Sequence, residues 1–184
     1  MIVILCTSRS GSSLVAGTFK AHGCYLGDCG TFADYERFEN LRLRNHLRHH
    51  QHENGWKFPQ FVKDPGGSAE LIKELKLDLY KCGVEFWDIL KPHASHVVKI
   101  YRDPDMAAKS VSGRHGGDDM KEARYRVAKR YEMLDAIPGV TVNTDEVIAG
   151  DFTTLQAAVE SCGLVWNEEK ARRVVDPAKW HHHK

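Results

Sequence analysis

The feature that most constrains this 184-residue chain is an unbroken aliphatic run, Ile2–Leu5, followed at once by a loop of small polar residues. Such a run is typical of a strand that is buried on both faces of a parallel sheet. Apolar and small residues then recur at helical spacing, namely Leu14, Val15, Thr18 and Phe19. A strand, a small-residue loop and a helix in this order turn backbone N–H groups toward one point. The pattern therefore predicts an anion site, usually one for a phosphate.

The residues missing from this loop limit the phosphate chemistry that it can serve. A Walker A loop needs a Lys after its last Gly, but Gly11 is followed by Ser12. If Cys6 were a phosphatase nucleophile, we would expect an Arg six residues later, where Ser12 again stands. Arg9 supplies the charge inside the loop. A tight strand-to-helix turn with Ser caps is the simplest alternative.

Length and composition limit the class of protein. A chain of 184 residues can bury one sizeable core, so we expect a single domain over 1–184, with 177–184 as a tail. The formal net charge of +1 argues against a nucleic-acid binder. No apolar run approaches a membrane span of about 18 residues and no leader precedes the first strand, so we expect no membrane segment. Five Cys without a C-x-x-C pair favour reduced thiols and a cytoplasmic location.

The segment after the first helix predicts a loop and then a basic helix. Cys24 and Cys29 lie in a Gly-rich stretch and are too few for a zinc site, so free thiols are expected. The range 35–52 is predicted to be a helix with a basic outer face, either simply solvated or able to attract an acidic acceptor. Three histidines on it have a spacing that could hold a metal: His46, His49 and His50.

The rest of the chain predicts alternating strands and helices. A second strand is expected at Gln60–Lys63, followed by an Asp-Pro-Gly-Gly turn, and a third at His96–Tyr101. The apolar stripe Leu71–Leu90 predicts a long helix, or two helices divided at Gly83. Further expected elements are a helix from Pro104, helices over 120–134, 152–162 and 168–175, and a strand over 140–142. This alternation predicts an α/β fold, a P-loop-type three-layer sandwich with a central parallel sheet of about four to five strands and helices on both faces.

The stretch Ser8-Arg9-Ser10-Gly11-Ser12-Ser13 resembles the 5′-phosphosulfate loop of the sulfotransferases that use 3′-phosphoadenosine 5′-phosphosulfate (PAPS), particularly the small bacterial and phage members. That family holds the 3′-phosphate of PAPS with an Arg at the end of a strand and a Ser eight residues later. Arg102 and Ser110 have this spacing. An Arg at a strand's end and a Ser two turns into the next helix can converge on one phosphate.

The resemblance covers most of the chain and implies a chemistry. The protein would transfer a sulfonate from PAPS to a hydroxyl or amine of a small-molecule or glycan acceptor, releasing 3′-phosphoadenosine 5′-phosphate (PAP). The backbone of Ser10–Ser13 would bind the 5′-phosphosulfate, and Arg9 would neutralise the leaving oxygen, with Lys63 as a second candidate. A transferring sulfonate carries less charge than a phosphoryl group, so no metal is expected, and positioning plus charge stabilisation remain.

The sequence offers several candidates for the general base. The chain has Gly30-Thr31-Phe32-Ala33-Asp34 where many small relatives have Gly-Tyr-Phe-Glu-Asp, so the Glu of that motif is missing. The C-terminal Arg-Lys-Gly segment of cytosolic members is also missing. Asp34 is the favoured base because it aligns beside the acidic position, although it could equally cap the helix predicted from Tyr35. The other candidates are Glu36, Asp64 and His115.

Two other classes of function stay open. A P-loop enzyme of the nucleotide-kinase kind is weakened by Ser12, which stands where a Lys is needed. A non-catalytic protein that binds PAP or another adenine nucleotide is compatible with Ala33 in place of the base. The acceptor itself is not readable, and hydroxyls of sugars, lipids, phenols and peptides are all compatible with the sequence.

Overall fold

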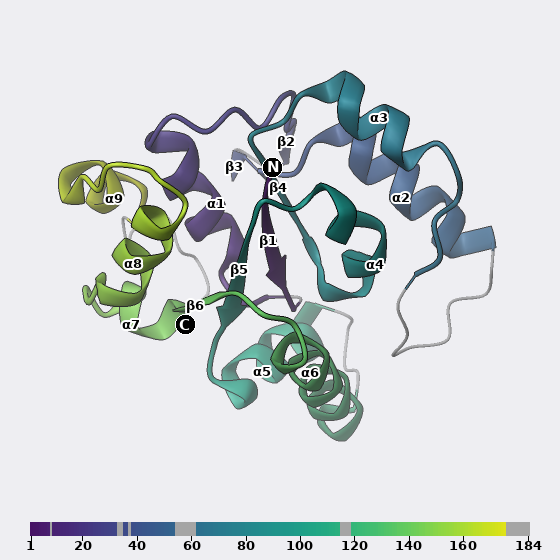
Figure 1. The fold of residues 1–184 in the computed structure, drawn as a ribbon. Coiled ribbons are helices and arrows are strands. Elements are labelled where there is room, and N and C mark those ends of the chain that lie inside the picture. Colours follow the sequence, from purple (N-terminus) through teal and green to yellow (C-terminus); the bar gives the residue numbers. More distant parts are fainter. Residues whose placement is uncertain (8, 33–34, 37, 54–61, 115–118, 176–184) are drawn as a thin grey trace.

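In the computed structural model of the protein, residues 1–7, 9–32, 35–36, 38–53, 62–114 and 119–175 are described. Among them, a four-stranded parallel sheet has the order β4-β1-β5-β6 (Figure 1). Its strands are β1 (Ile2–Cys6), β4 (Leu79–Gly83), β5 (His96–Tyr101) and β6 (Val140–Asn143). The predicted α/β fold with a central parallel sheet is confirmed.

β1 is the centre of the sheet because both of its faces are covered. Ile4 packs into one hydrophobic cluster with Leu14 of α1 (Ser12–Ala21). Val3 and Leu5 pack into the other cluster, on the opposite face. Val3, Ile4 and Leu5 are all fully buried, which explains why apolar and polar residues do not alternate along β1.

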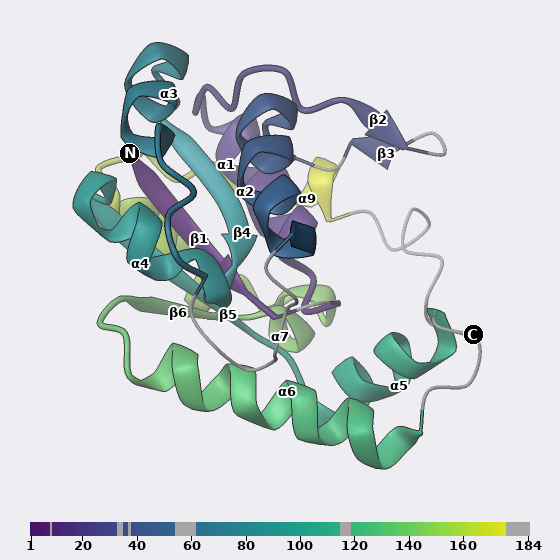
Figure 2. The same cartoon turned by 90° about the vertical axis from the view of Figure 1, so that its right-hand side faces the viewer.

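Helices cover both faces of the sheet (Figure 1). The face that carries Ile4 packs against α1, α7 (Thr144–Ile148) and α8 (Thr153–Ser161), and α9 (Glu168–Val174) packs on α1. The face that carries Val3 and Leu5 packs against α2 (Leu41–Glu53), α3 (Ser68–Leu75), α4 (Trp87–Leu90) and the end of α6 (Met120–Asp135). Helix α5 (Pro104–Arg114) lies beside α6, as Figure 2 shows. Short 3-10 turns, Val84–Phe86 and Lys91–His93, flank α4.

The helix predicted to start at Tyr35 starts later. Residues Tyr35–Glu36 form β3, which pairs antiparallel with β2 (Thr31–Phe32), and α2 begins only at Leu41. The side chain of Asn40 accepts a hydrogen bond of 3.0 Å from the backbone N–H of Leu43. Asn40 therefore acts as the N-terminal cap and fixes the start of the helix.

The second strand was predicted at the wrong place. Val62 and Lys63 lie outside any strand, and residues 60–61 fall outside the described residues. The strand that pairs with β1 is β4, inside the range predicted to be helical. Leu71, Leu75 and Leu79 keep helical spacing by coincidence, but the left-handed conformation of Lys76 (φ 47°) ends α3 before the third of them. The strands predicted at His96–Tyr101 and Val140–Val142 are found, the latter extended by one residue to Asn143.

Candidate functional site

β1 leads into a loop whose backbone is held in place from two sides. Ser10 is fully buried; its hydroxyl donates to the Thr7 carbonyl at 3.0 Å, and its own carbonyl accepts from the Thr144 hydroxyl at 2.7 Å. Gly11, the N-cap of α1, has φ 79°, and a Cβ there would lie 3.0 Å from the Thr144 Cβ. Both conformation and space therefore require Gly. Because Gly11 has no side chain to cap α1, the first-turn N–H groups suit an anion.

Two arginines and a serine meet beside this loop. Arg9 has a left-handed backbone (φ 67°), which is uncommon outside Gly, and its Nε donates to the Ser110 hydroxyl at 2.8 Å. Nη1 of Arg102 donates to the Arg9 carbonyl at 3.3 Å. Arg102 and Ser110, the pair predicted from its spacing, both contact Arg9, the first at its backbone carbonyl and the second at its guanidinium. We call these three residues the arginine cluster.

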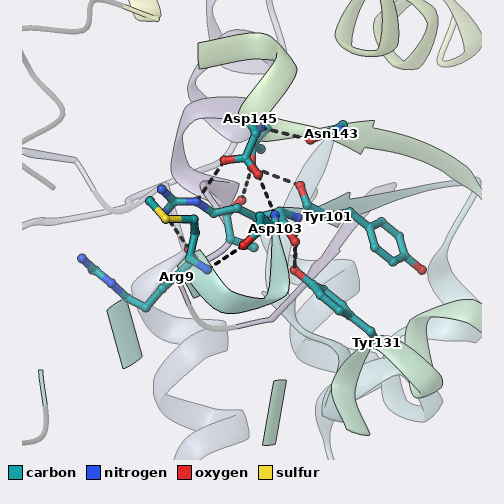
Figure 3. A network of polar contacts seen from close by, with 10 residues as sticks. Arg9, Tyr101, Asp103, Tyr131, Asn143 and Asp145 are labelled. Carbon is teal, nitrogen blue, oxygen red and sulfur yellow. Dashed lines mark hydrogen bonds and ion pairs between the residues drawn. The ribbon is translucent and has the colours of Figure 1, made fainter. Parts of the chain in front are cut away.

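Arg102 is held through its backbone by Tyr131 and through its side chain by Asp145, and Figure 3 labels both of these partners. The Tyr131 hydroxyl accepts from the Arg102 N–H at 3.1 Å and donates to the Arg102 carbonyl at 2.7 Å. Asp145 accepts from Arg102 Nε at 3.3 Å and from the Asp103 N–H at 2.6 Å, and its own N–H is bound by the Asn143 side chain at 3.1 Å. Burial raises the pKa of Tyr131, so its hydroxyl stays protonated for this role.

A second charged group lies on the other side of the loop. The Lys81 ammonium in β4, only 4% exposed, donates to the Ser13 hydroxyl at 2.9 Å and lies 3.4 Å from Glu39 Oε1. The other Glu39 oxygen lies 3.8 Å from Nη2 of Arg48. Glu39, Lys81 and Arg48 line one small pocket together with Arg44. We call Glu39, Lys81, Arg44 and Arg48 the Glu39 cluster. A buried ammonium needs partners of this kind, because desolvation of an unpaired charge is costly.

Comparison of the sequence with protein-family models and with curated proteins finds no match. Among solved structures, the protein is similar to the sulfotransferase domain from the Synechococcus PCC 7002 olefin synthase, with a TM-score of 0.55 and 14% sequence identity. The similarity covers 98% of this chain and 86% of that chain. The chain has a sulfotransferase fold. At this identity the similarity shows the fold, and the arrangement of side chains has to be judged on the contacts above.

The sequence predicts Lys63 and Asp64 at the carboxyl end of a strand. Among the described residues, no strand of the sheet leads directly into them. Asp64 accepts from the Gly66 N–H at 2.9 Å and from the Ser68 hydroxyl at 2.6 Å, which is the role of a turn residue before α3. Both residues line a surface depression with Asp88 and other residues of α4 and the turn after it. No residue of the arginine cluster or the Glu39 cluster lines that depression.

Several predicted site residues fall outside what the structure describes. Ser8, Asp34 and His115 lie outside the described residues. Glu36 lies in β3, but only its backbone is described. Their predicted roles therefore remain predictions. Ser12 and Ser13 form the start of α1.

No sequence pattern points to Glu39, and Lys81 has only a weak signal, because it is a single charge within the apolar stretch Leu79–Val84. Cys6, in contrast, is placed where a nucleophile would be unreactive. Burial raises the pKa of its thiol, and the thiol donates to the Cys82 carbonyl at 3.1 Å. The five cysteines are free.

No group of three or more His, Cys, Asp or Glu residues that could hold a metal occurs within the described part of the chain. In that same part, no helix has the length and apolar character needed to cross a membrane.

Proposed function

We propose that the protein transfers a sulfonate group from PAPS to a hydroxyl of a small-molecule or glycan acceptor, without a metal ion. The observation that carries this proposal is the convergence of Arg9, Arg102 and Ser110 at the carboxyl edge of a sheet with a sulfotransferase fold. Arg9 donates to Ser110 through its guanidinium and accepts from Arg102 through its backbone carbonyl, so two cationic side chains and a hydroxyl lie beside the loop, which suits a phosphate dianion. The resemblance of Ser8–Ser13 to the 5′-phosphosulfate loop agrees with it.

The contacts support a division of labour between the two clusters. The arginine cluster would bind the 3′-phosphate, because Arg9 extends its guanidinium to Ser110 instead of back toward α1. The phosphosulfate would lie at the N-terminus of α1, where Gly11 allows close approach. Lys81, which reaches Ser13, is then the cation near the leaving oxygen, in place of Arg9 and Lys63, the candidates from the sequence.

Glu39 is the carboxylate best placed to act as general base among the described residues. It is 18% exposed and is linked to α1 through Lys81 and Ser13. In the transfer, the acceptor oxygen forms a bond to sulfur while the bond from sulfur to the phosphate oxygen breaks, and the acceptor proton passes to Glu39. Lys81 would stabilise the charge that develops on the leaving phosphate.

Calorimetry of PAP, AMP and ATP in the presence of EDTA tests the proposal. PAP should bind at least about tenfold more tightly than AMP, because a charge-assisted contact is worth roughly 1.5–3 kcal/mol and only PAP has a 3′-phosphate. Transfer from PAPS should survive EDTA. Equal affinities for PAP and AMP contradict the proposal. Binding that needs Mg²⁺ and prefers ATP supports a nucleotide kinase, and PAP binding with no transfer to any acceptor supports a non-catalytic binder.

A further inference from the structure

Three arginines on α2 have different surroundings, although they lie within two turns of one helix. Arg42 Nη1 is 2.7 Å from Glu74 on α3, and both side chains are about 60% exposed. Arg48 lies 3.8 Å from Glu39 and is half exposed. Arg44 forms no ion pair within the described residues, and its Nε is buried without a hydrogen-bond partner. Buried polar atoms are nearly always satisfied, so this Nε points to a missing partner.

The missing partner of Arg44 should carry negative charge. The small pocket that Arg44 lines also contains the side chains of Arg48, Lys81, Glu39 and Tyr80. Three cations therefore face one carboxylate. Burial raises the pKa of Tyr80 while the nearby Arg48 and Arg44 lower it, so the Tyr80 hydroxyl stays a neutral group that can donate. The pocket thus offers donors and excess positive charge to a ligand.

The size of the pocket limits how such a ligand can enter. Its free volume is about 10 Å³, which is room for one water-sized oxygen. A whole acceptor molecule cannot fit, but one oxygen of an acid group can enter toward Arg44 while the rest stays near the exposed Arg48. Glu39 lies at the same pocket, so a molecule held in this way keeps its other groups close to the proposed base.

We propose that Arg44 and Arg48 form an anion subsite for the acceptor, and that the acceptors are hydroxylated acids bearing a carboxylate, sulfate or phosphate. The inference rests on the proposed function, in which Glu39 takes the proton of the acceptor hydroxyl. The acid group binds the two guanidinium groups and supplies the partner that Arg44 Nε lacks. The hydroxyl of the same molecule then lies next to Glu39. Glu39 contacts Lys81, and Lys81 in turn contacts Ser13 of α1.

An NMR titration observes these arginines directly. Inorganic sulfate is added to protein saturated with PAP, and the Nε–H signals of Arg42, Arg44 and Arg48 are followed. We expect saturable shifts for Arg44 and Arg48 and none for Arg42, the matched control on the same helix. Arg44→Gln should weaken sulfate binding about tenfold, as expected for one charge-assisted hydrogen bond, and Arg42→Gln should not change it. Equal shifts of all three signals, or no shift of Arg44, overturn the inference.

Two further measurements separate this inference from the proposed function. If PAP fails to bind but sulfate still shifts Arg44, the anion subsite stands and the sulfotransferase function is wrong. If PAP binds and is formed from PAPS while sulfate does not shift the Arg44 signal, the sulfotransferase function stands and the anion subsite is wrong. In turnover, hydroxy acids should react at least tenfold faster than their methyl esters at low acceptor concentration. Arg48→Gln, a change at a half-exposed residue, should remove that preference without changing PAP affinity.

Discussion

The arginine cluster and the Glu39 cluster lie on opposite sides of one loop, but they are held in different ways. In the arginine cluster, backbone groups fix the positions: Tyr131 binds both the N–H and the carbonyl of Arg102, and Arg102 binds the carbonyl of Arg9. The Glu39 cluster is joined through the ends of side chains, at 3.4 Å to Lys81 and 3.8 Å to Arg48.

The difference matches what each side would bind. A cluster fixed through the backbone has one geometry, which suits a ligand that is the same in every turnover, such as the nucleotide of the proposed donor. A cluster joined through long side chains can rearrange around ligands of different shape, which suits an acceptor. We therefore expect changes in the arginine cluster to alter nucleotide affinity, and changes in the Glu39 cluster to alter turnover.

The largest expected effect is on the Glu39 side. Glu39→Gln removes the proposed base and keeps a side chain of similar size beside Lys81. Turnover with PAPS and an acceptor should fall by about 10²- to 10⁴-fold, the usual contribution of a general base. PAP affinity measured by calorimetry should stay within about twofold, since the base does not touch the nucleotide in the proposed arrangement.

Asp34→Asn is the comparison variant for this experiment, because the sequence favoured Asp34 as the base. If Asp34→Asn loses turnover and Glu39→Gln keeps it, the base lies on Asp34 and the Glu39 cluster is structural. The alternative role of Asp34 as a cap of the helix predicted from Tyr35 is wrong, because α2 begins at Leu41 with Asn40 as its cap. Thermal unfolding of both variants shows whether a loss of turnover reflects lost stability or lost chemistry.

The next effect is on the stability of the loop between the two clusters. Gly11→Ala forces a side chain into a left-handed position (φ 79°) and against Thr144. Gly163→Ala is the matched control, because Gly163 has φ 76° and nothing lies within 4 Å of an added Cβ. The control should cost about 1–2 kcal/mol for the backbone alone, and Gly11→Ala about 1–3 kcal/mol more for overpacking. Equal losses in denaturant unfolding would show that Thr144 gives way without cost.

A smaller effect is expected on nucleotide binding. Arg102→Ala should weaken PAP by about tenfold or more and leave AMP nearly unchanged, because a charge-assisted contact is worth roughly 1.5–3 kcal/mol. Calorimetry with both nucleotides measures this difference. If both lose the same factor, Arg102 supports the loop through the Arg9 carbonyl and makes no contact with the 3′-phosphate.

The sequence predicts the pairing of Arg102 with Ser110 in the arginine cluster, but it assigns Arg9 to the leaving oxygen and not to this pair. Arg9 lies in the loop that follows β1, and Arg102 directly follows the strand His96–Tyr101. In a parallel sheet, such strand ends meet at one edge, so Arg9 and Arg102 had to be neighbours. Ser110 follows from helical geometry alone.

The Glu39 cluster could not be predicted, because it depends on β4 and on the start of α2, and the sequence pattern predicts both of them wrongly. Leu79 of β4 continues the four-residue spacing of Leu71 and Leu75, so the sequence predicts a helix over the segment that contains Lys81. The helix predicted from Tyr35 includes Glu39 and Asn40 in its first turns, whereas in the structure Asn40 is the N-terminal cap and Glu39 precedes the helix. Both errors come from local patterns, which do not show that β4 pairs with β1 or that Tyr35–Glu36 pairs with β2.

The smallest predicted change tests how the arginine cluster balances charge. Asp145 lies 3.3 Å from Arg102 Nε, so it orients that guanidinium and also opposes any phosphate that approaches it. Asp145→Asn keeps an oxygen for the Asp103 N–H and removes the charge. If repulsion dominates, PAP should bind about fivefold more tightly, corresponding to roughly 1 kcal/mol for one charge in a solvated site; the gain should shrink as salt screens it, and AMP should not change. If orientation dominates, PAP binding weakens instead, and the Tyr131 contacts alone are then insufficient to hold Arg102 for the 3′-phosphate. Calorimetry at low and high salt distinguishes the two outcomes, and we expect the gain because the backbone of Arg102 is already fixed at both its N–H and its carbonyl.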